Sequence, residues 1–158
     1  MSKYLQSILF LLTAGMFAVS CQDNYNICEL SKEVKMKAGL YTISGGIEQP
    51  ATAPSFSMGF LNAGSQIYNQ KTDISKFSAT LNSVTDTSKF FIRLSPTLQP
   101  DTLYVIYSSQ SSLLSTECGY VMINDITKTI VTNHTIDSVV LINPVTNTTS
   151  TENIKVYF

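Results

Sequence analysis

Residues 90–108, FFIRLSPTLQPDTLYVIYS, contain the two stretches that decide the fold. In the first, Phe90, Ile92 and Leu94 alternate with a phenylalanine and an arginine. A period of two places one set of side chains in a core and the other toward solvent, as in a half-buried β-strand. The two prolines that follow end this strand.

The second stretch, residues 102–108, is apolar on both faces. Leu103, Val105 and Tyr107 would lie on one face, and Tyr104 and Ile106 on the other. A strand that is apolar on both faces is typical of the middle of a sheet, so this stretch predicts a central strand.

The same pattern of short strands and turn clusters continues on both sides of this segment, and no long stretch has helical spacing. It predicts strands at residues 33–43, 56–62, 65–69, 77–84, 90–95, 102–108, 117–124, 128–133, 138–142 and 153–158. Residues 44–55, with a glycine pair and two prolines, and the serine-rich residues 108–116 are predicted loops, and Asp125 a turn. The expected fold is all-β: an antiparallel two-layer β-sandwich of immunoglobulin-like or jelly-roll kind, with about eight to ten strands.

The first residues have the features of an export signal. A single lysine precedes an apolar run from Ile8 to Val19, which is shorter than the ~20 residues that span a bilayer. The run ends in Phe17-Ala18-Val19-Ser20-Cys21, which resembles the lipobox of bacterial lipoproteins. The resemblance implies a diacylglycerol on the Cys21 sulfur and cleavage before it; the alternative is an uncleaved anchor helix with an incidental cysteine.

On this interpretation, residues 1–20 are a removed signal peptide, 21–31 a lipidated tether and 32–158 a single β-sandwich domain. Two acyl chains suffice for stable membrane attachment, so the membrane is one expected partner. Gln22 is not the aspartate that resembles an inner-membrane retention signal, which favours the outer membrane.

Composition narrows the classes of function. The chain has 10 basic and 11 acidic residues and no basic cluster, so we expect no nucleic-acid partner. Eight tyrosines and eight phenylalanines stand beside no tryptophan. Tyr104, Tyr107, Tyr120 and Tyr157 could form a binding surface, but packing is the more common role in strands.

Cys28 and Cys118 remain once Cys21 is assigned to lipid. Outside the cytoplasm two such cysteines most simply form a disulfide, and the alternative is two buried free thiols. Two cysteines and one distant histidine do not make a metal ligand set, so we expect no metal and no cofactor.

No motif predicts catalysis. His134, the only histidine, lies in a polar turn, and the chain has no Gly-x-Ser-x-Gly elbow, no calcium loop and no phosphate-binding loop. Paired carboxylates could act on sugars, and the acidic candidates are Glu48, Asp73, Asp86, Glu117 and Asp125. Turns commonly use such residues for backbone hydrogen bonds, and Glu117, which enters a strand, is the hardest to explain in that way.

Three motifs resemble an uncharacterised family of small lipoproteins from the Bacteroidota: an early cysteine (Cys28), Glu-Cys-Gly-aromatic at 117–120, and the Asn-Ile-Lys-aromatic C-terminus at 153–158. The resemblance implies a Gram-negative envelope and supports a Cys28–Cys118 pair, but brings no activity with it. Asp-Ser/Thr-apolar triplets also resemble O-glycosylation sites of exported proteins in that phylum, which implies possible glycans on Thr102 and Ser138; ordinary turn chemistry explains the same triplets.

The sequence therefore predicts an envelope lipoprotein that acts as a non-catalytic binding or assembly accessory, with a protein or glycan partner. The predicted loops 44–55 and 108–116 are its expected binding surfaces. Two other functions stay open: a carbohydrate-active enzyme that uses Glu117 and a second carboxylate, and a purely structural envelope component.

Overall fold

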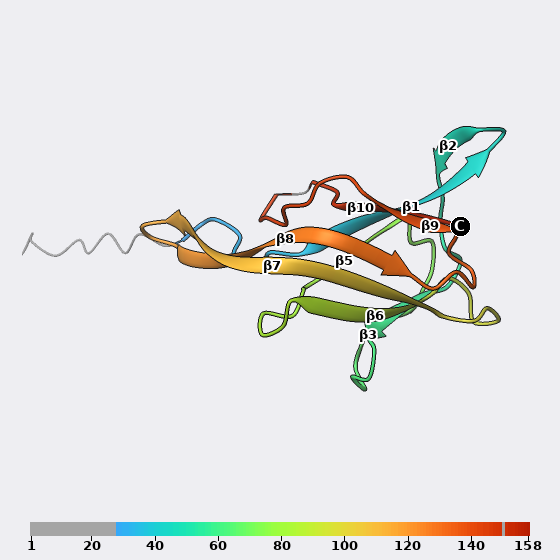
Figure 1. The fold of residues 1–158 in the computed structure, drawn as a ribbon, viewed down its shortest axis with the longest axis horizontal. Coiled ribbons are helices and arrows are strands. Elements are labelled where there is room, and N and C mark those ends of the chain that lie inside the picture. The colour runs from blue at the N-terminus through green and yellow to red at the C-terminus, as the bar shows by residue number, and fades with distance from the viewer. Residues whose placement is uncertain (1–27, 150) are drawn as a thin grey trace, which may run out of the picture.

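The computed structural model describes residues 28–149 and 151–158, and this part of the chain is built from ten β-strands (Figure 1). No helix in it is long and apolar enough to span a membrane. The strands are β1 (Met36–Ser44), β2 (Ile47–Pro50), β3 (Phe56–Phe60), β4 (Gln66–Lys71), β5 (Lys76–Ala79), β6 (Thr87–Arg93), β7 (Asp101–Ser115), β8 (Gly119–Val131), β9 (Ser138–Leu141) and β10 (Ile154–Tyr157).

The strands form two five-stranded sheets that share one core, which confirms the predicted all-β two-layer sandwich. Sheet A has the order β2-β1-β10-β9, and β5 pairs with the first half of β1 while β2 pairs with the second half. Sheet B has the order β4-β3-β6-β7-β8. Every pairing is antiparallel except that of β1 with β10, which is parallel.

The core lies between the two sheets and is filled by the alternating residues of each. In sheet A, Met36, Ala38 and Leu40 of β1 are buried. In sheet B the buried set includes Phe90 and Ile92, as the alternation predicts. The rings of Phe56 from sheet B and Phe77 from sheet A lie 5.0 Å apart between centroids, so aromatic packing joins the two layers.

The predicted central strand is also confirmed, because β7 lies between β6 and β8. The strand is longer than expected, however, and the prediction of a loop at 108–116 is wrong. Residues 108–113 of β7 pair with residues 120–125 of β8, and Figure 1 shows this ribbon reaching beyond the other strands. Such a ribbon has less core to face than the rest of the sheet, so its serines need not follow an apolar alternation.

The prediction of a loop at 44–55 is wrong in part. Gly45 and Gly46 have φ of 60° and 81°, and they form the two-residue turn that joins β1 to β2. Positive φ at both central residues is typical of tight hairpins. All of β2 is exposed, and it ends at Pro50 on a sheet edge, where a missing amide donor is tolerated.

The prediction of a turn at Asp125 is wrong, because this residue lies within β8. Asn124 and Asp125 have turn-forming side chains, yet their backbone is paired with β7 on one side. On the other side, residues 144–146 supply further pairing: the amide of Thr146 donates to the carbonyl of Asn124 at 2.8 Å. This pairing on both sides makes one strand of the two predicted at 117–124 and 128–133. The strand predicted at 77–84 is also shorter, since β5 ends at Ala79.

Asn153 explains how β1 and β10 come to pair in parallel across the chain. Its side chain is buried and accepts a hydrogen bond from the Lys37 amide at 2.9 Å. Its amide group donates to the carbonyls of Asn143 and Val145. The Asn153 side chain thus joins the start of β10 both to β1 and to the segment before β10. These hydrogen bonds hold the register in which Tyr41 lies opposite Tyr157.

Candidate functional site

The outer face of sheet A carries a network of polar contacts that joins three of its strands. Met36, Ala38 and Leu40 point inward. Since side chains alternate along a strand, the odd-numbered residues of β1, among them Tyr41, point outward. The strand pairing brings Tyr157 opposite Tyr41, and Lys155, two residues earlier on β10, opposite Gly39. Glu48 reaches the same face from β2.

These residues form one network. The Tyr157 hydroxyl donates to Glu48 Oε2 at 2.5 Å. Glu48 also forms an ion pair with Lys155, whose Nζ lies 4.7 Å from the centre of the Tyr41 ring. The Tyr41 hydroxyl donates to Glu152 Oε1 at 3.0 Å. We call these five residues, Tyr41, Glu48, Glu152, Lys155 and Tyr157, the outer tyrosine surface.

Gly39 makes room for this network. A Cβ atom at position 39 would lie 2.7 Å from the Tyr41 ring and would also collide with the Glu152 carboxylate. Such distances are shorter than van der Waals contact. The absence of a side chain at this position therefore lets Glu152 lie across β1 and reach Tyr41.

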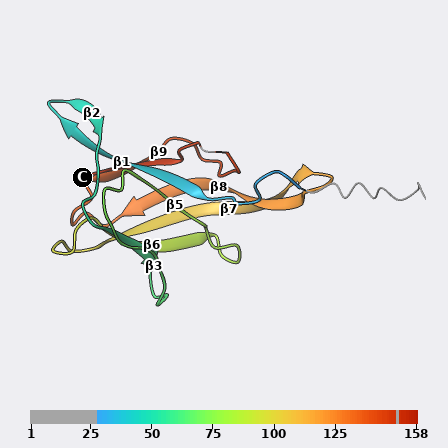
Figure 2. The same ribbon diagram turned by 180° about the vertical axis from the view of Figure 1, so that it is seen from behind.

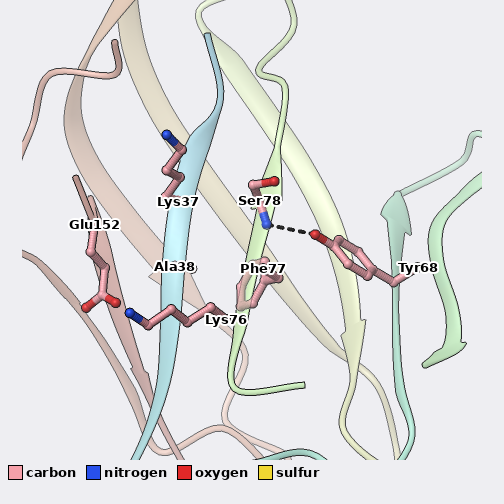
Figure 3. Close-up of a pocket in the computed structure, with 7 residues that line it drawn as sticks. All are labelled: Lys37, Ala38, Tyr68, Lys76, Phe77, Ser78 and Glu152. Atoms are coloured by element: carbon pink, nitrogen blue, oxygen red, sulfur yellow. Dashed lines mark hydrogen bonds between the residues drawn. The ribbon is translucent and has the colours of Figure 1, made fainter. Parts of the chain in front are cut away.

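A pocket of about 250 Å³ adjoins the outer tyrosine surface and shares Glu152 with it (Figure 3). Figure 3 shows the amino group of Lys76 pointing toward the Glu152 carboxylate, and the Ser78 amide donating to the Tyr68 hydroxyl at 3.0 Å. The lining residues are Lys37, Ala38, Tyr68, Lys76, Phe77, Ser78 and Glu152. The pocket therefore combines two lysines and one carboxylate with apolar lining residues.

The network fixes the charges of the surface. Hydrogen bonds from Lys155 and Tyr157 lower the pKa of Glu48, and the Glu48 carboxylate raises the pKa of Lys155 and of Tyr157. Burial, and then the hydrogen bond to Glu152, raise the pKa of Tyr41. At neutral pH the surface therefore presents ionised Glu48 and Lys155 beside two neutral tyrosines.

The four tyrosines suggested by the sequence do not form one surface. Tyr157 belongs to the outer tyrosine surface, whereas Tyr104 lies on β7 in sheet B, with Lys89 Nζ 5.5 Å from its ring centre. Tyr107 is buried and donates to the Asn82 carbonyl at 2.7 Å. Tyr120 is 71% exposed near the end of the β7–β8 ribbon.

The predicted carboxylates lie on different elements, with Glu48 on β2 and Asp125 on β8. Glu117 is exposed in the turn after β7, and hydrogen bonds from the Thr116 hydroxyl, its own amide and Ser115 lower its pKa. A general acid needs a raised pKa, and the pKa of Glu48 is lowered too. Asp73 lies in a turn with φ of 55°, and Asp86 in the turn before β6.

Asp101, the first residue of one predicted glycosylation triplet, is buried, and its carboxylate accepts hydrogen bonds from the next loop. The amides of His134, Thr135 and Ile136 donate to it at 2.8, 2.8 and 2.9 Å. His134 is thus held by its backbone, and its side chain is exposed.

The two candidate glycosylation residues differ in access. Thr102 is half-buried on β7, while Ser138 is exposed at the start of β9.

The two predicted disulfide residues lie together. Cys28 and Cys118 are in disulfide geometry, with Cα atoms 4.8 Å apart. Cys118 lies in the turn between β7 and β8, so the pair joins the start of the described chain to the end of the ribbon. The predicted lipidation residue, Cys21, lies outside the described residues.

Sequence reasoning identified Glu48 and Tyr157 separately but missed Tyr41, Glu152 and Lys155. Tyr41 could have been found as the outward residue of the first predicted strand, which alternates Met36, Ala38 and Leu40 with lysines. Its neighbours could not, because they depend on a parallel pairing between strands far apart in the chain.

A family model described as a family of unknown function (DUF6452) matches residues 57–158. The match includes Glu152, Lys155 and Tyr157, while β1, β2 and Cys28 precede it. No curated protein and no solved structure matches the chain.

Proposed function

Because the chain belongs to this family of unknown function, which brings no activity with it, we propose from its surface that it is a lipid-anchored envelope protein that binds a protein partner without catalysis. The lipobox-like segment around Cys21 supports the anchor, and Gln22 supports the outer membrane. The outer tyrosine surface supports the binding role.

One observation carries the binding proposal: an ordered set of tyrosines and paired charges is bordered by exposed apolar side chains. Ile43 is 64% exposed on β1, and Val140 is 47% exposed on β9, directly opposite Lys155. Tyrosine is enriched at protein interfaces because it combines an apolar ring with a polar tip. An amphipathic face with fixed charges is typical of a protein partner, and a glycan would be the other outcome of the test.

The position of this face also supports the proposal. The described chain begins beside the tip of the β7–β8 ribbon, at one end of the long axis. The C-terminus and β2 lie at the other end (Figure 1). An anchor on Cys21 would thus hold the outer tyrosine surface away from the membrane, where a partner can reach it.

Site-specific photo-crosslinking in living cells tests the binding role. A photoreactive residue at Val140 should give one discrete adduct, and mass spectrometry of the adduct identifies a protein or a glycan. The matched control is Ile130, which is 43% exposed on the outer face of sheet B, opposite Tyr104. It should give no adduct.

Charge variants complete the test. Lys155→Glu should remove the adduct by breaking the pairing with Glu48, whereas Lys128→Glu, on sheet B, should leave it unchanged. Equal labelling from positions 140 and 130, or an adduct that survives Lys155→Glu, would contradict the proposal. Protease treatment of intact cells then reports which side of the outer membrane the domain occupies.

A further inference from the structure

The β7–β8 ribbon carries a surface that the proposed binding role does not use. We call residues 108–124, which form its outer part, the hairpin arm. Glu117 is the only charged residue in this segment. Leu113, Tyr120 and Met122 are 54%, 71% and 43% exposed, so the arm presents apolar groups to its surroundings.

These three side chains share one face. Leu113 is directly opposite Tyr120, and Met122 is opposite Ser111. Residues directly opposite in an antiparallel pair lie on the same face, and so do residues two positions along. The arm therefore exposes a continuous apolar strip rather than scattered side chains.

The disulfide pair limits how far this strip can lie from the expected anchor. Cys118 in the arm is paired with Cys28, which follows Cys21 by only seven residues. A chain of that length reaches at most about 25 Å. Without the pairing, the first fixed strand would be β1 at Met36, and the reach would be roughly twice as long.

We infer that the hairpin arm rests on the lipid surface, with Leu113, Tyr120 and Met122 buried among the outer lipid groups. This inference rests on the proposed lipid anchor at Cys21. The arm favours a lipid surface because its one charged residue, Glu117, lies exposed in the turn, and burial of the apolar strip costs no desolvated ion pair. A tyrosine is suited to that depth, since its ring is apolar and its hydroxyl can stay in water.

The chain lacks tryptophan, which allows a single fluorescent probe. The lipoprotein with Tyr120→Trp is purified from membranes and placed in phosphatidylcholine vesicles with brominated acyl chains. Tryptophan emission should shift to shorter wavelength and be quenched by the bromine. The control is Ile47→Trp, because Ile47 is 65% exposed on β2 at the far end of the molecule. Its emission should be unquenched.

Two further variants give the test its specificity. Leu113→Asp with Met122→Asp in the Tyr120→Trp lipoprotein should abolish the quenching. Cys28→Ser with Cys118→Ser should weaken it, because the tether lengthens. High salt should leave it unchanged, since the contact is apolar.

The outcomes separate this inference from the anchor itself. Intact mass shows whether Cys21 carries lipid, and an unmodified chain would overturn the anchor proposal and this inference together. A lipidated protein whose two probes are quenched equally, or not at all, would overturn the membrane contact alone. A blue shift without quenching would mean that protein, such as a second copy, covers the strip, and it too would overturn the inference.

Discussion

At the scale of single residues, Asp101 does the most to stabilise a loop. Its buried carboxylate accepts three backbone hydrogen bonds from residues 134–136 and one from the Thr132 hydroxyl. Burial acts to raise its pKa, but the hydrogen bonds from His134, Ile136, Thr135 and Thr132 outweigh it, and the pKa is lowered. The ionised form is therefore the one that the fold requires.

Asp101→Asn should destabilise the domain by about 3 kcal/mol at pH 7, because an amide nitrogen cannot accept the bonds and leaves buried donors unpaired. Urea unfolding measures the change. Asp137→Asn, at an exposed position, is the control and should change the unfolding free energy by less than about 0.5 kcal/mol.

The same residue predicts a pH dependence. Since the folded pKa of Asp101 lies below its ordinary value of 3.8, its contribution is complete above that pH and is lost as the pH falls through the folded pKa. Wild type should lose stability on acidification below about pH 4 more steeply than Asp101→Asn. Parallel curves for the two proteins would show that Asp101 does not titrate in this way.

At the scale of elements, the β7–β8 hairpin depends on its turn. Gly119 has a φ of 74° and pairs with Ser115 where the two strands meet. A side chain is strained in this left-handed region, which glycine adopts freely.

Gly119→Ala should therefore cost about 1 kcal/mol of unfolding free energy. Gly64→Ala is the matched control, because Gly64 lies in the β3–β4 turn with no positive φ and no atom near its missing Cβ. Chemical denaturation of both variants gives the comparison, and an equal effect would show that the turn at Gly119 is not strained.

Elements also show what the sequence can and cannot predict. The alternation at Phe90, Ile92 and Leu94 identified β6, since a strand over a core must repeat every two residues. The outer part of β7, residues 108–115, was missed because alternation disappears where a ribbon leaves the core. The break expected at Asp125 was wrong because residues 144–146 pair with β8 there, which no local pattern shows.

The outer tyrosine surface was missed for a related reason. Glu48 and Tyr157 are 109 residues apart, and only the register of β2, β1 and β10 brings them into hydrogen-bond contact. Cross-strand contacts of this range depend on strand order, which composition and periodicity do not encode.

At the scale of the whole molecule, the two ends have different surfaces. One end combines the hairpin arm with Cys28, and the other carries β2, the C-terminus and part of the outer tyrosine surface; Figure 2 shows the same separation from behind. The disulfide pair contributes to stability as well as to this arrangement, because it spans 90 residues of the chain.

Replacing both Cys28 and Cys118 with alanine should lower the unfolding free energy by about 4 kcal/mol, since the pair restricts a long loop in the unfolded chain. Urea unfolding with and without reductant measures this: reduced wild type should match the double variant. Alkylation of the native protein followed by mass spectrometry should find no free thiol at either position, and two alkylated cysteines would contradict the pairing.

The parallel pairing of β1 with β10 has a consequence for biogenesis. Residues 38–41 form their ladder with residues 154–157, so sheet A stays incomplete until the last strand has been delivered. Contacts of this sequence separation form late, because the loop between them must close first. If the chain is exported as proposed, it must remain unfolded in the export channel, and this topology would delay the sandwich until translocation is finished.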